Sequence, residues 1–507
     1  MADDKKPMTN DQQPGAAHPR VDPAERRAAR LAVATVSFGT FLATITGSAI
    51  RVAFPSIAEG LDASWAGIQW VSMVFLLTVT SLLATTGRLG DLYGLKRLYI
   101  TGIVLFVTGS ALCGAAWSLP ALIVFRMLQA CGSAMTASMG PALVATAALP
   151  GQRGRAMGWI GTAVAIGLSA GPPIGGFLLE LGSWRWVFLI NLPLGVLAVT
   201  GALLFLPRTA PAGPRPRFDL LGSLLLGSGF AALLLGLSHG RDWGWTSATL
   251  LGLIAAASVL IVVFLLWERR TAAPVLDLSL FSNRVFSSAV SSAMLLFMAT
   301  IGVSFLVVFY LTHGLGLDGW RLGLVMAAQP LGSAASAPFA GRVSDRIGSL
   351  PLTVSGALII VTAYGLLAWQ CERGEIWAVA LPLALIGLGH GIFGSPNSSA
   401  LLGAAPRESL GIAGGVLATA RTLGMASGVA IAGATFGSIF ASGTGGLELS
   451  AYRPEHFGPL IEGMRTSLFV AMGIAITATV LAALRGRERA GIDAELATVE
   501  PVEPGTE

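Results

Sequence analysis

Ionisable and amide side chains inside long apolar runs are the residues of this sequence best able to do chemistry. Arg126 lies in one such run with Gln129 one helical turn later, and Arg421 lies in another. His390 and Asn397 have a spacing that places both on one face of a helix. We expect these side chains to line a cavity, where they could bind the polar part of a ligand or carry protons. A packing role for His390 and a snorkelling role for Arg421 are the alternatives.

A second polar stripe lies within residues 41–61, FLATITGSAIRVAFPSIAEGL. Thr44, Ser48 and Arg51 recur there at helical spacing, and Thr46 lies between them. Because a polar stripe facing lipid would be costly, we expect it to face the same cavity, with snorkelling of Arg51 to the headgroups as the alternative. None of the 27 Asp and Glu residues falls in the middle of an apolar run, so the sequence predicts a cavity with an excess of positive charge.

Long apolar helices are needed to hold these residues, and the composition predicts them. Of the 507 residues, 54% are hydrophobic and 12% charged, whereas a soluble domain carries about 25% charged residues. The sequence therefore predicts an all-α polytopic membrane protein. A helix needs about 20 apolar residues to cross a bilayer. The fourteen runs expected to do so are 31–54, 64–87, 98–118, 120–148, 155–180, 185–206, 219–238, 246–267, 285–312, 321–341, 350–370, 376–403, 409–440 and 463–484.

The distribution of charge predicts the orientation of these spans. With residue 1 in the cytoplasm, most of the 32 Lys and Arg residues fall in cytoplasmic segments, as the positive-inside rule requires. An even number of spans puts both termini there, and the net charge of +5 then reflects topology and not nucleic-acid binding. The three Cys residues form no disulfide framework. We expect a monomeric, multi-pass protein of the plasma membrane, that of a bacterial inner membrane.

An internal repeat divides the chain into two similar parts. The segment GRLGDLYG at 87–94 returns as GRVSDRIG at 341–348, after the second and the tenth predicted spans. That separation fits a six-span unit duplicated around two inserted spans, and such repeats are typical of secondary transporters. The predicted divisions are a disordered tail 1–28, a six-helix bundle 29–206, a linker 207–217, two inserted helices 218–267, a linker 268–284, a six-helix bundle 285–487 and a disordered tail 488–507.

The repeated loops supply a candidate gate on the cytoplasmic side. Asp91 and Asp345 can accept hydrogen bonds from helix N-terminal amides or pair with an arginine such as Arg97 or Arg346. The glycines permit close helix approach. A generic loop with one cap is the alternative. The residues assigned to the gate are Gly87, Arg88, Asp91, Gly94, Arg97, Gly341, Arg342, Asp345 and Gly348.

The run 155–180 combines small residues with two adjacent prolines. Its glycines and prolines of interest are Gly167, Gly171, Pro172, Pro173, Gly175 and Gly176. Glycines four residues apart let helices approach closely in lipid, and prolines are tolerated where neighbours satisfy the freed carbonyls. We expect a helix that bends or pivots against its partner, with ordinary membrane packing as the alternative.

Several motifs together resemble the major facilitator superfamily, in its fourteen-helix drug:proton antiporter branch. The segments similar to its signatures are GRLGDLYGLKR (87–97) after helix 2, RMLQACGSA (126–134) in helix 4 and GTAVAIGLSAGPPIGG (161–176) in helix 5. Further similar segments are SWRWVFLINLPLG (183–195), FDLLG (218–222) and PVLDLSLFSNRVF (274–286). The resemblance implies two six-helix bundles, two inserted helices and alternating access by rocking.

The resemblance also implies roles for single residues. It links the helix 5 signature with export and with sealing against leak, and it links Arg126 with proton handling. Ala130 stands where the helix 4 motif usually has glycine. Thr46 stands where helix 1 usually carries an acid, and Arg51 where it usually carries an asparagine. The usual proton carrier is therefore missing, and the remaining candidates are Asp91, Arg126, Glu180 and His390.

Export of small amphipathic compounds, such as antibiotics or secondary metabolites, is the function that these features favour. Lysine occurs only at positions 5, 6 and 96, so no phosphate-binding loop with its lysine forms and ATP is not the direct driver. We expect proton coupling, no cofactor or metal, and a neutral, zwitterionic or anionic substrate, because a quaternary cation would lack a carboxylate partner. The alternatives are an importer or uncoupled facilitator on the same fold, and a membrane enzyme or lipid scramblase.

Overall fold

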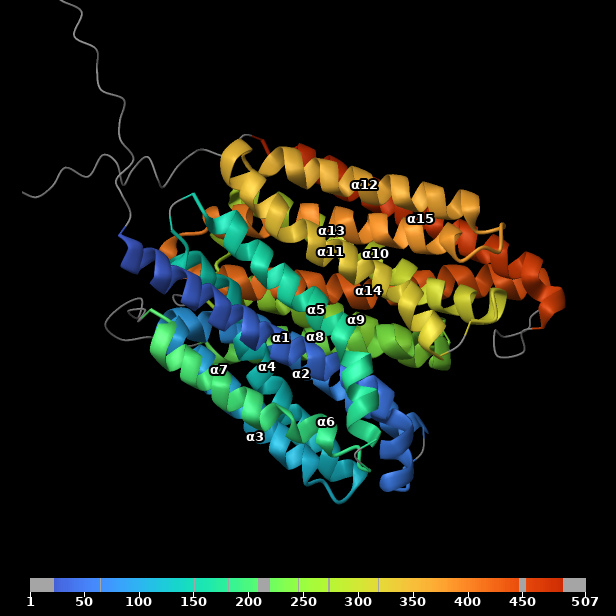
Figure 1. Ribbon diagram of the computed structural model, residues 1–507, viewed down its shortest axis with the longest axis horizontal. Helices are drawn as coiled ribbons and strands as arrows, with labels where there is room; N and C mark the ends of the chain where they lie inside the picture. The colour runs from blue at the N-terminus through green and yellow to red at the C-terminus, as the bar shows by residue number, and fades with distance from the viewer. Residues whose placement is uncertain are drawn as a thin grey trace, which may run out of the picture.

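The computed structural model describes residues 22–486 except 64, 150, 181, 208–218, 245, 272–273, 318 and 446–452. Every regular element among these residues is helical, and Figure 1 shows the long helices running side by side. The chain is therefore all-α in the described residues, as its composition predicts. The expected tail 488–507, the first part of the expected tail 1–28 and most of the linker 207–217 lie outside them.

The helices follow one another along the chain in the order of their labels. They are α1 (Pro23–Gly60), α2 (Trp65–Tyr93), α3 (Leu95–Gly114), α4 (Leu119–Ala147), α5 (Arg153–Glu180), α6 (Trp186–Leu189), α7 (Asn191–Phe205), α8 (Leu220–Trp243), α9 (Ala248–Glu268), α10 (Arg284–Phe309), α11 (Gly319–Ile347), α12 (Ser349–Gln370), α13 (Trp377–Gly403), α14 (Leu410–Thr444) and α15 (Phe457–Ala483). Short 3₁₀ helices cover Leu278–Ser282, Arg407–Ser409 and Pro454–His456, and a π-turn covers Tyr310–Gly314.

Thirteen stretches of the described residues are long and apolar enough to cross a membrane, with α6 and α7 counted as one. They make this a multi-pass membrane protein. The expected span 321–341 lies in α11, which is 29 residues long but is not among the thirteen. Its serines, prolines and terminal charges lower its hydropathy. The structure thus gives thirteen candidate spans where the sequence predicts fourteen.

The first helix begins earlier than the sequence predicts. α1 starts at Pro23, inside the segment 1–28 that we expected to be a disordered tail. Asp22 caps it by accepting a hydrogen bond from the amide of Ala24 (2.9 Å), and proline at the first helical position has a suitable φ. The polar first turns therefore belong to a long helix that continues into the apolar span.

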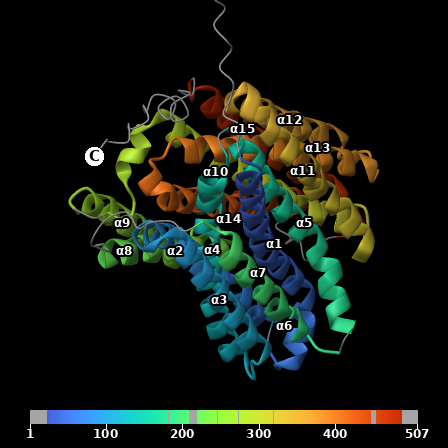
Figure 2. The same ribbon diagram turned by 60° about the vertical axis from the view of Figure 1, so that its left-hand side comes forward.

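The helices form two bundles with a hairpin beside them. α1–α7 make the first bundle and α10–α15 the second. α8 and α9 pack on each other, and α8 packs against α2 and α14. Figure 2 shows this hairpin at the edge of the molecule next to α2. The two bundles meet where α5 packs against α11 and where α2 packs against α14. We call the end of the molecule at which α1 begins the near end and the opposite end the far end.

Side-chain caps hold the inserted hairpin at the near end. Asp219 accepts a hydrogen bond from the Gly222 amide at the start of α8 (2.9 Å), and its other oxygen accepts one from the Trp267 indole of α9 (2.8 Å). Glu268, at the end of α9, accepts a hydrogen bond from the Leu276 amide. These contacts join both ends of the hairpin to the connection that leads into α10.

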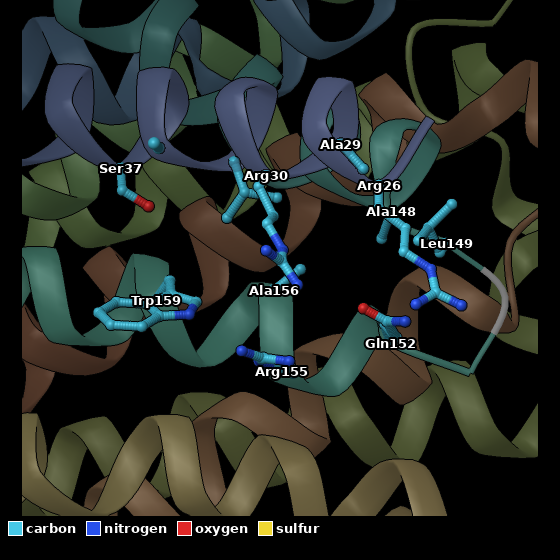
Figure 3. A pocket seen from close by; sticks show the side chains of 12 residues that line it. Arg26, Ala29, Arg30, Ser37, Ala148, Leu149, Gln152, Arg155, Ala156 and Trp159 are labelled. Carbon is cyan, nitrogen blue, oxygen red and sulfur yellow. The ribbon is translucent and has the colours of Figure 1, made fainter. Parts of the chain in front are cut away.

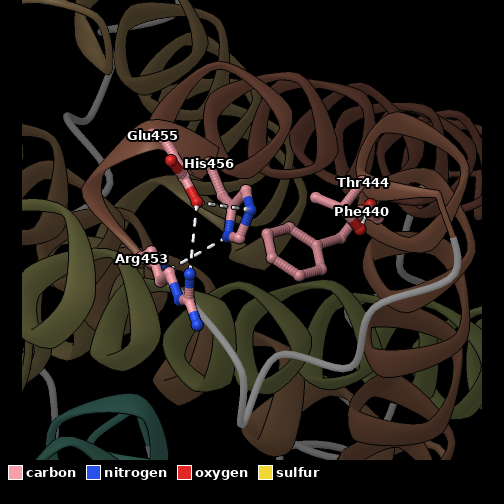
Figure 4. Close-up of polar contacts among 5 residues, drawn as sticks. All are labelled: Phe440, Thr444, Arg453, Glu455 and His456. Carbon is pink, nitrogen blue, oxygen red and sulfur yellow. Dashed lines mark hydrogen bonds and ion pairs between the residues drawn. The ribbon is translucent and has the colours of Figure 1, made fainter.

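The residues just before α15 contact one another and the end of α14. The Arg453 amide donates a hydrogen bond to His456 Nδ1 (3.1 Å), and the His456 ring packs edge-on against Phe440 at 6.3 Å (Figure 4). Glu455 lies 3.9 Å from Arg453 in an exposed ion pair. Such a pair contributes little, about 0–1 kcal/mol, so the His456 capping and ring contacts fix the start of α15.

Glycines of α5 bring it into backbone contact with α1. A Cβ at Gly175 would lie 2.7 Å from the Ala49 carbonyl oxygen, and one at Gly167 would lie 2.9 Å from Thr44 Cβ. A Cβ at Gly171 would overlap the Ser48 hydroxyl. α5 remains one helix through Pro172 and Pro173. Gly167, Gly171 and Gly175 are therefore the residues whose small size allows α5 to pack on α1.

The same contact changes the expected position of the polar stripe on α1. Thr44 and Ser48 face α5 and not a cavity, and the Ser48 hydroxyl donates to the Gly167 carbonyl oxygen (2.9 Å). The Thr44 hydroxyl donates within its own helix to the Thr40 carbonyl oxygen (2.7 Å). The Ser48 hydroxyl thus bonds to the neighbouring helix and the Thr44 hydroxyl to its own helix, so the stripe expected to face a cavity packs on α5 here. Arg51 lies in α1, but its side chain is outside the described set.

Replacement of Gly175 by Ala is expected to destabilise the α1–α5 contact. The added methyl meets a backbone oxygen that no side-chain rotation can move, and overpacking costs about 1–3 kcal/mol. Gly176→Ala is the matched control, because a Cβ there meets nothing within 4 Å. Thermal unfolding of the detergent-solubilised variants should show a lower midpoint for Gly175→Ala alone. Equal midpoints would contradict the close packing.

Candidate functional site

Asp91, near the end of α2, contacts the start of α14 across the two bundles. Its Oδ1 accepts a hydrogen bond from the Gly411 amide (2.7 Å) and its Oδ2 accepts one from the Ile412 amide (2.9 Å). The Asp91 side chain is buried. The first amides of a helix have no partner within it and carry partial positive charge, so they suit a carboxylate. We call this the Asp91 contact.

Asp345, near the end of α11, makes the corresponding contact with the start of α5. Its two oxygens accept hydrogen bonds from the amides of Gly154 (2.8 Å) and Arg155 (3.0 Å). We call this the Asp345 contact. Each bundle therefore supplies one carboxylate to the other, from the second helix of one to the fifth helix of its partner. The two contacts together join the bundles at the near end.

Glycines make both contacts possible. A Cβ at Gly87 would lie 2.5 Å from the Gly411 carbonyl oxygen, and a Cβ at Gly341 would overlap the Gly154 carbonyl oxygen. The turns after α2 and α11 end at Gly94 (φ 95°) and Gly348 (φ 86°), a backbone region that favours glycine. In each repeated loop the first glycine, Gly87 or Gly341, thus allows the two helices to approach closely. The last glycine, three residues after the aspartate, allows a turn with positive φ.

The arginines of the repeated loops lie elsewhere than expected. Arg97, Arg342 and Arg346 are exposed, and no carboxylate pairs with them in the described part of the chain. Arg88 is half-buried and lies near enough to Asp91 to act on it electrostatically. Backbone amides, not these arginines, satisfy the two aspartates.

Arg126 belongs to a chain of polar side chains inside the first bundle. It donates to the Gln129 Oε1 (2.6 Å) and to the Val71 carbonyl oxygen (3.3 Å). Gln129 donates to the Ser110 hydroxyl (2.7 Å), which also accepts from the amide of Asn191 (2.8 Å). The chain thus links α2, α4, α3 and α7, and it contains no carboxylate.

Thr46 of α1 forms one end of this chain of polar side chains. At the other end, the ring of Phe75 lies against Arg126. The Thr46 hydroxyl donates to Asn191 Oδ1 (2.7 Å), and the guanidinium carbon of Arg126 lies 4.2 Å from the Phe75 ring centre. The side chains of Arg126, Gln129 and Thr46 are 2%, 0% and 3% exposed. They are enclosed by their own bundle in this structure, where we expected them to line a cavity. Internal hydrogen bonds account for the difference, because they replace water around the guanidinium.

A second polar group lies in the other bundle around Phe297 of α10. Arg421 of α14 has its guanidinium carbon 5.3 Å from the Phe297 ring centre and donates to the Ser398 hydroxyl (2.7 Å). The His390 ring of α13 lies 4.6 Å from the same aromatic ring. The structure thus brings together His390 and Arg421, which the sequence identified separately.

This second group is less completely hydrogen-bonded than the first. His390 Nε2, Arg421 Nε and Asn397 Oδ1 are buried atoms without a hydrogen-bond partner. The Asn397 amide donates to the Ala289 carbonyl oxygen of α10 (2.9 Å) and so joins the helices of the bundle. Unsatisfied buried polar atoms are costly, and a ligand with hydrogen-bonding groups could satisfy those of His390 and Arg421.

The acidic residues lie away from both polar groups. Within the described helices each Asp or Glu is close to a helix end, and Glu180 is exposed at the far end of α5. No group of three or more His, Cys, Asp and Glu suited to a metal occurs in this part of the chain. The middle of the molecule therefore carries arginine without an opposing carboxylate among the described side chains.

Sequence reasoning missed Asn191, Ser110, Phe75 and Phe297. Asn191 stands in an otherwise apolar stretch of the quoted segment 183–195, which was a usable signal. Ser110 carries none, because serine is common in membrane helices. The two phenylalanines act through ring contacts with arginine that only the tertiary structure reveals.

The fold agrees with comparisons to known proteins. The sequence matches the family described as Major Facilitator Superfamily over residues 36–225 and 218–429. The chain belongs to the major facilitator superfamily. The resemblance to this superfamily noted from its motifs is therefore confirmed.

Two curated relatives and one solved structure illustrate the relationship. The chain is 32% identical to the riboflavin transporter of Clostridioides difficile (strain 630), over 88% of this chain and 95% of that protein. It is 29% identical to the tetracenomycin C resistance and export protein of Streptomyces glaucescens, over 89% and 88%. The crystal structure of a human organic anion transporter, TETRAN, is similar with a TM-score of 0.62 at 17% identity, covering 91% and 100% of the chains. That last similarity concerns the fold alone.

Proposed function

We propose that this protein is a secondary active exporter of small amphipathic compounds that works by alternating access. The observation that carries the proposal is the pair of reciprocal contacts made by Asp91 and Asp345. Both join the bundles at one end, so breaking and remaking them would open and close that end. A relative named as a resistance and export protein supports the direction. Uptake or facilitated transport is the second candidate, because another relative is named a riboflavin transporter, a name that gives no direction.

The near end is proposed to face the cytoplasm. We also propose that α11 crosses the membrane, which brings the number of spans to fourteen. Arg26, Arg30, Arg88, Arg97 and Arg155 all lie at this end, as the positive-inside rule expects of a cytoplasmic face. The closed contacts then describe a state shut towards the cytoplasm. The protein is proposed to act as a monomer in the plasma membrane.

The substrate is proposed to be neutral, zwitterionic or anionic. Arg421 and His390 present buried unpaired nitrogen atoms around Phe297, and no described carboxylate opposes them. A carboxylate, phenolate or carbonyl group of a substrate would satisfy these nitrogens, and Phe297 would pack on an aromatic portion. A permanent cation would meet like charge instead.

Proton coupling is proposed as the energy source. Asp91, Arg126, Glu180 and His390 remain the candidate proton carriers. Thr46, at the helix 1 position where the family usually has an acid, has a neutral hydroxyl bonded to Asn191. Asp91 combines burial with a position at the inter-bundle contact, so a proton there would weaken the contact directly.

Reconstituted protein should carry anionic and neutral amphipathic dyes under an imposed pH gradient and leave quaternary cationic dyes behind. Vesicles holding each dye are monitored for fluorescence change with the gradient in either direction, which also separates export from uptake. Efficient transport of the quaternary cations would contradict the proposed substrate class. Transport independent of the gradient would contradict proton coupling.

Replacement of Arg421 by Gln is expected to reduce transport of anionic dyes about tenfold or more and to affect neutral dyes less. A charge-assisted hydrogen bond contributes about 1.5–3 kcal/mol, whereas the neutral amide keeps only part of it. Arg373→Gln is the matched control, because Arg373 also lies over an aromatic ring, Trp369 at 4.5 Å, but is exposed. Equal anion transport by the wild type and Arg421→Gln would remove Arg421 from substrate binding.

A further inference from the structure

A groove between the first turns of α1 and α5 lies away from the polar groups described above. It has a volume of about 840 Å³ and is open to the outside of the molecule. Figure 3 shows Arg26 and Arg30 reaching into it from α1, opposite Gln152 and Arg155. The end of α4, with Ala148 and Leu149, forms part of its wall. The groove thus lies at the near end, within the first bundle.

The groove carries strong positive charge. Asp345 lies near enough to Arg155 to interact with it electrostatically, but its oxygens accept hydrogen bonds from backbone amides. Three of its lining residues, Arg26, Arg30 and Arg155, are arginines, and none of the lining residues is acidic. No carboxylate of the described chain forms an ion pair with any of the three. Arginine binds phosphate oxygens with two parallel hydrogen bonds, and it does so better than a point charge. The chemistry therefore suits a phosphate group.

Apolar residues continue the groove towards the middle of the membrane. Val33 and Ala34 follow Arg30 along α1, and Trp159 follows Arg155 along α5 with 44% of its surface exposed. Tryptophan is enriched at membrane–water interfaces, where one edge is wet and the other is in hydrocarbon. A ligand that fits has a phosphate at the cationic rim and an apolar chain against these side chains.

We propose that this groove binds the headgroup of an anionic phospholipid. Arg26, Arg30 and Arg155 hold the phosphodiester, and Val33, Ala34 and Trp159 contact the first part of an acyl chain. Basic pockets between membrane helices bind such headgroups by this combination of charge and apolar contact. A free phosphate ion would use the rim but would leave the apolar wall unfilled.

The groove adjoins the Asp345 contact. The backbone amide of Arg155 donates to Asp345, while its side chain lines the groove. A phosphate on that side chain would therefore rest beside the point at which α11 meets α5. The lipid would bind best when the start of α5 is held in this position.

Lipid retention by the purified full-length protein tests the proposal. The protein in a neutral detergent is titrated with phosphatidylglycerol, cardiolipin or phosphatidylcholine, and bound lipid is counted by native mass spectrometry alongside the thermal unfolding midpoint. Each arginine near a membrane surface contributes about fivefold to anionic lipid binding. Changing Arg26, Arg30 and Arg155 together to Gln is therefore expected to weaken retention of the anionic lipids by about a hundredfold and to abolish their stabilising shift.

A double change of Arg269 and Arg270 to Gln is the matched control, because both arginines are exposed at the end of α9 outside the groove. It should keep wild-type lipid retention and unfolding midpoints. Equal retention by the triple variant and the wild type would overturn the proposal. So would an equal shift from inorganic phosphate, which would identify a soluble anion site, or equal retention of phosphatidylcholine, which would identify an apolar groove without charge selectivity.

Discussion

Asp91→Asn should slow transport at least tenfold while changing substrate affinity by less than about threefold. The carboxylate holds the amides of Gly411 and Ile412 at 2.7 and 2.9 Å across the two bundles. Hydrogen bonds to a charged group contribute about 1.5–3 kcal/mol, and the asparagine NH₂ group would face a donor. A loss of about 2 kcal/mol would shift the equilibrium between closed and open near ends roughly thirtyfold. Transport into proteoliposomes and substrate binding by calorimetry give the two quantities.

A direct measurement of near-end closure makes this prediction sharper. Spin labels at the exposed positions Tyr93 and Arg407 flank the Asp91 contact, and their distance distribution reports the closed fraction. Asp277→Asn is the control, since Asp277 caps a short 3₁₀ helix through the Ser279 amide (2.9 Å) away from the inter-bundle contact. Unchanged turnover and an unchanged distance distribution in Asp91→Asn would rule out the gate.

Arg126→Ala should abolish transport, by more than about a hundredfold, in a protein that still folds. The guanidinium joins α4 to Val71 of α2 and, through Gln129, to Ser110 of α3. Removing it breaks the chain but also removes a buried charge, and those two effects on stability oppose each other. We expect the unfolding midpoint to move by only a few degrees while gradient-driven transport is lost.

Arg185→Ala provides the comparison for Arg126. Arg185 also contacts an aromatic ring, Trp184 at 4.5 Å, and a backbone oxygen, that of Ala116 at 2.9 Å, but it lies outside the polar chain. Its replacement should leave transport within about threefold of the wild type. Wild-type transport by Arg126→Ala would remove this residue from the mechanism, and Arg126→Lys would then be expected to show no defect either.

The type of contact made by Asp91 and Asp345 could be predicted from the sequence because the motif is repeated. Two aspartates at corresponding places after the second and the tenth predicted spans required similar surroundings, and helix N-terminal amides were among the partners expected. The sequence could not predict which helices would supply those amides. The starts of α14 and α5 each place a glycine, Gly411 or Gly154, where a Cβ would clash with the partner helix. With 64 glycines in the chain, residue type alone does not single out these two positions.

The face of each polar residue on α1 was predicted less well. Thr44 and Ser48 follow the expected periodicity, but the glycines of α5 offer them a packed surface that a helical repeat cannot distinguish from a cavity. Thr46 faces α7 instead, where its hydroxyl bonds to Asn191. Periodicity gives the relative directions of side chains along one helix, whereas the identity of the neighbour depends on how the helices are arranged.

The two sides of each inter-bundle contact differ in which mutations can remove them. One side of each is an aspartate side chain, which a single codon change removes. The other side is main chain at residues 411–412 or 154–155, where most substitutions keep the N–H group and only proline deletes it. A random mutagenesis screen for leaky or stalled transport should therefore recover lesions at Asp91 and Asp345 in many chemical forms. At the amide positions it should recover mainly proline or bulky replacements of Gly411 and Gly154.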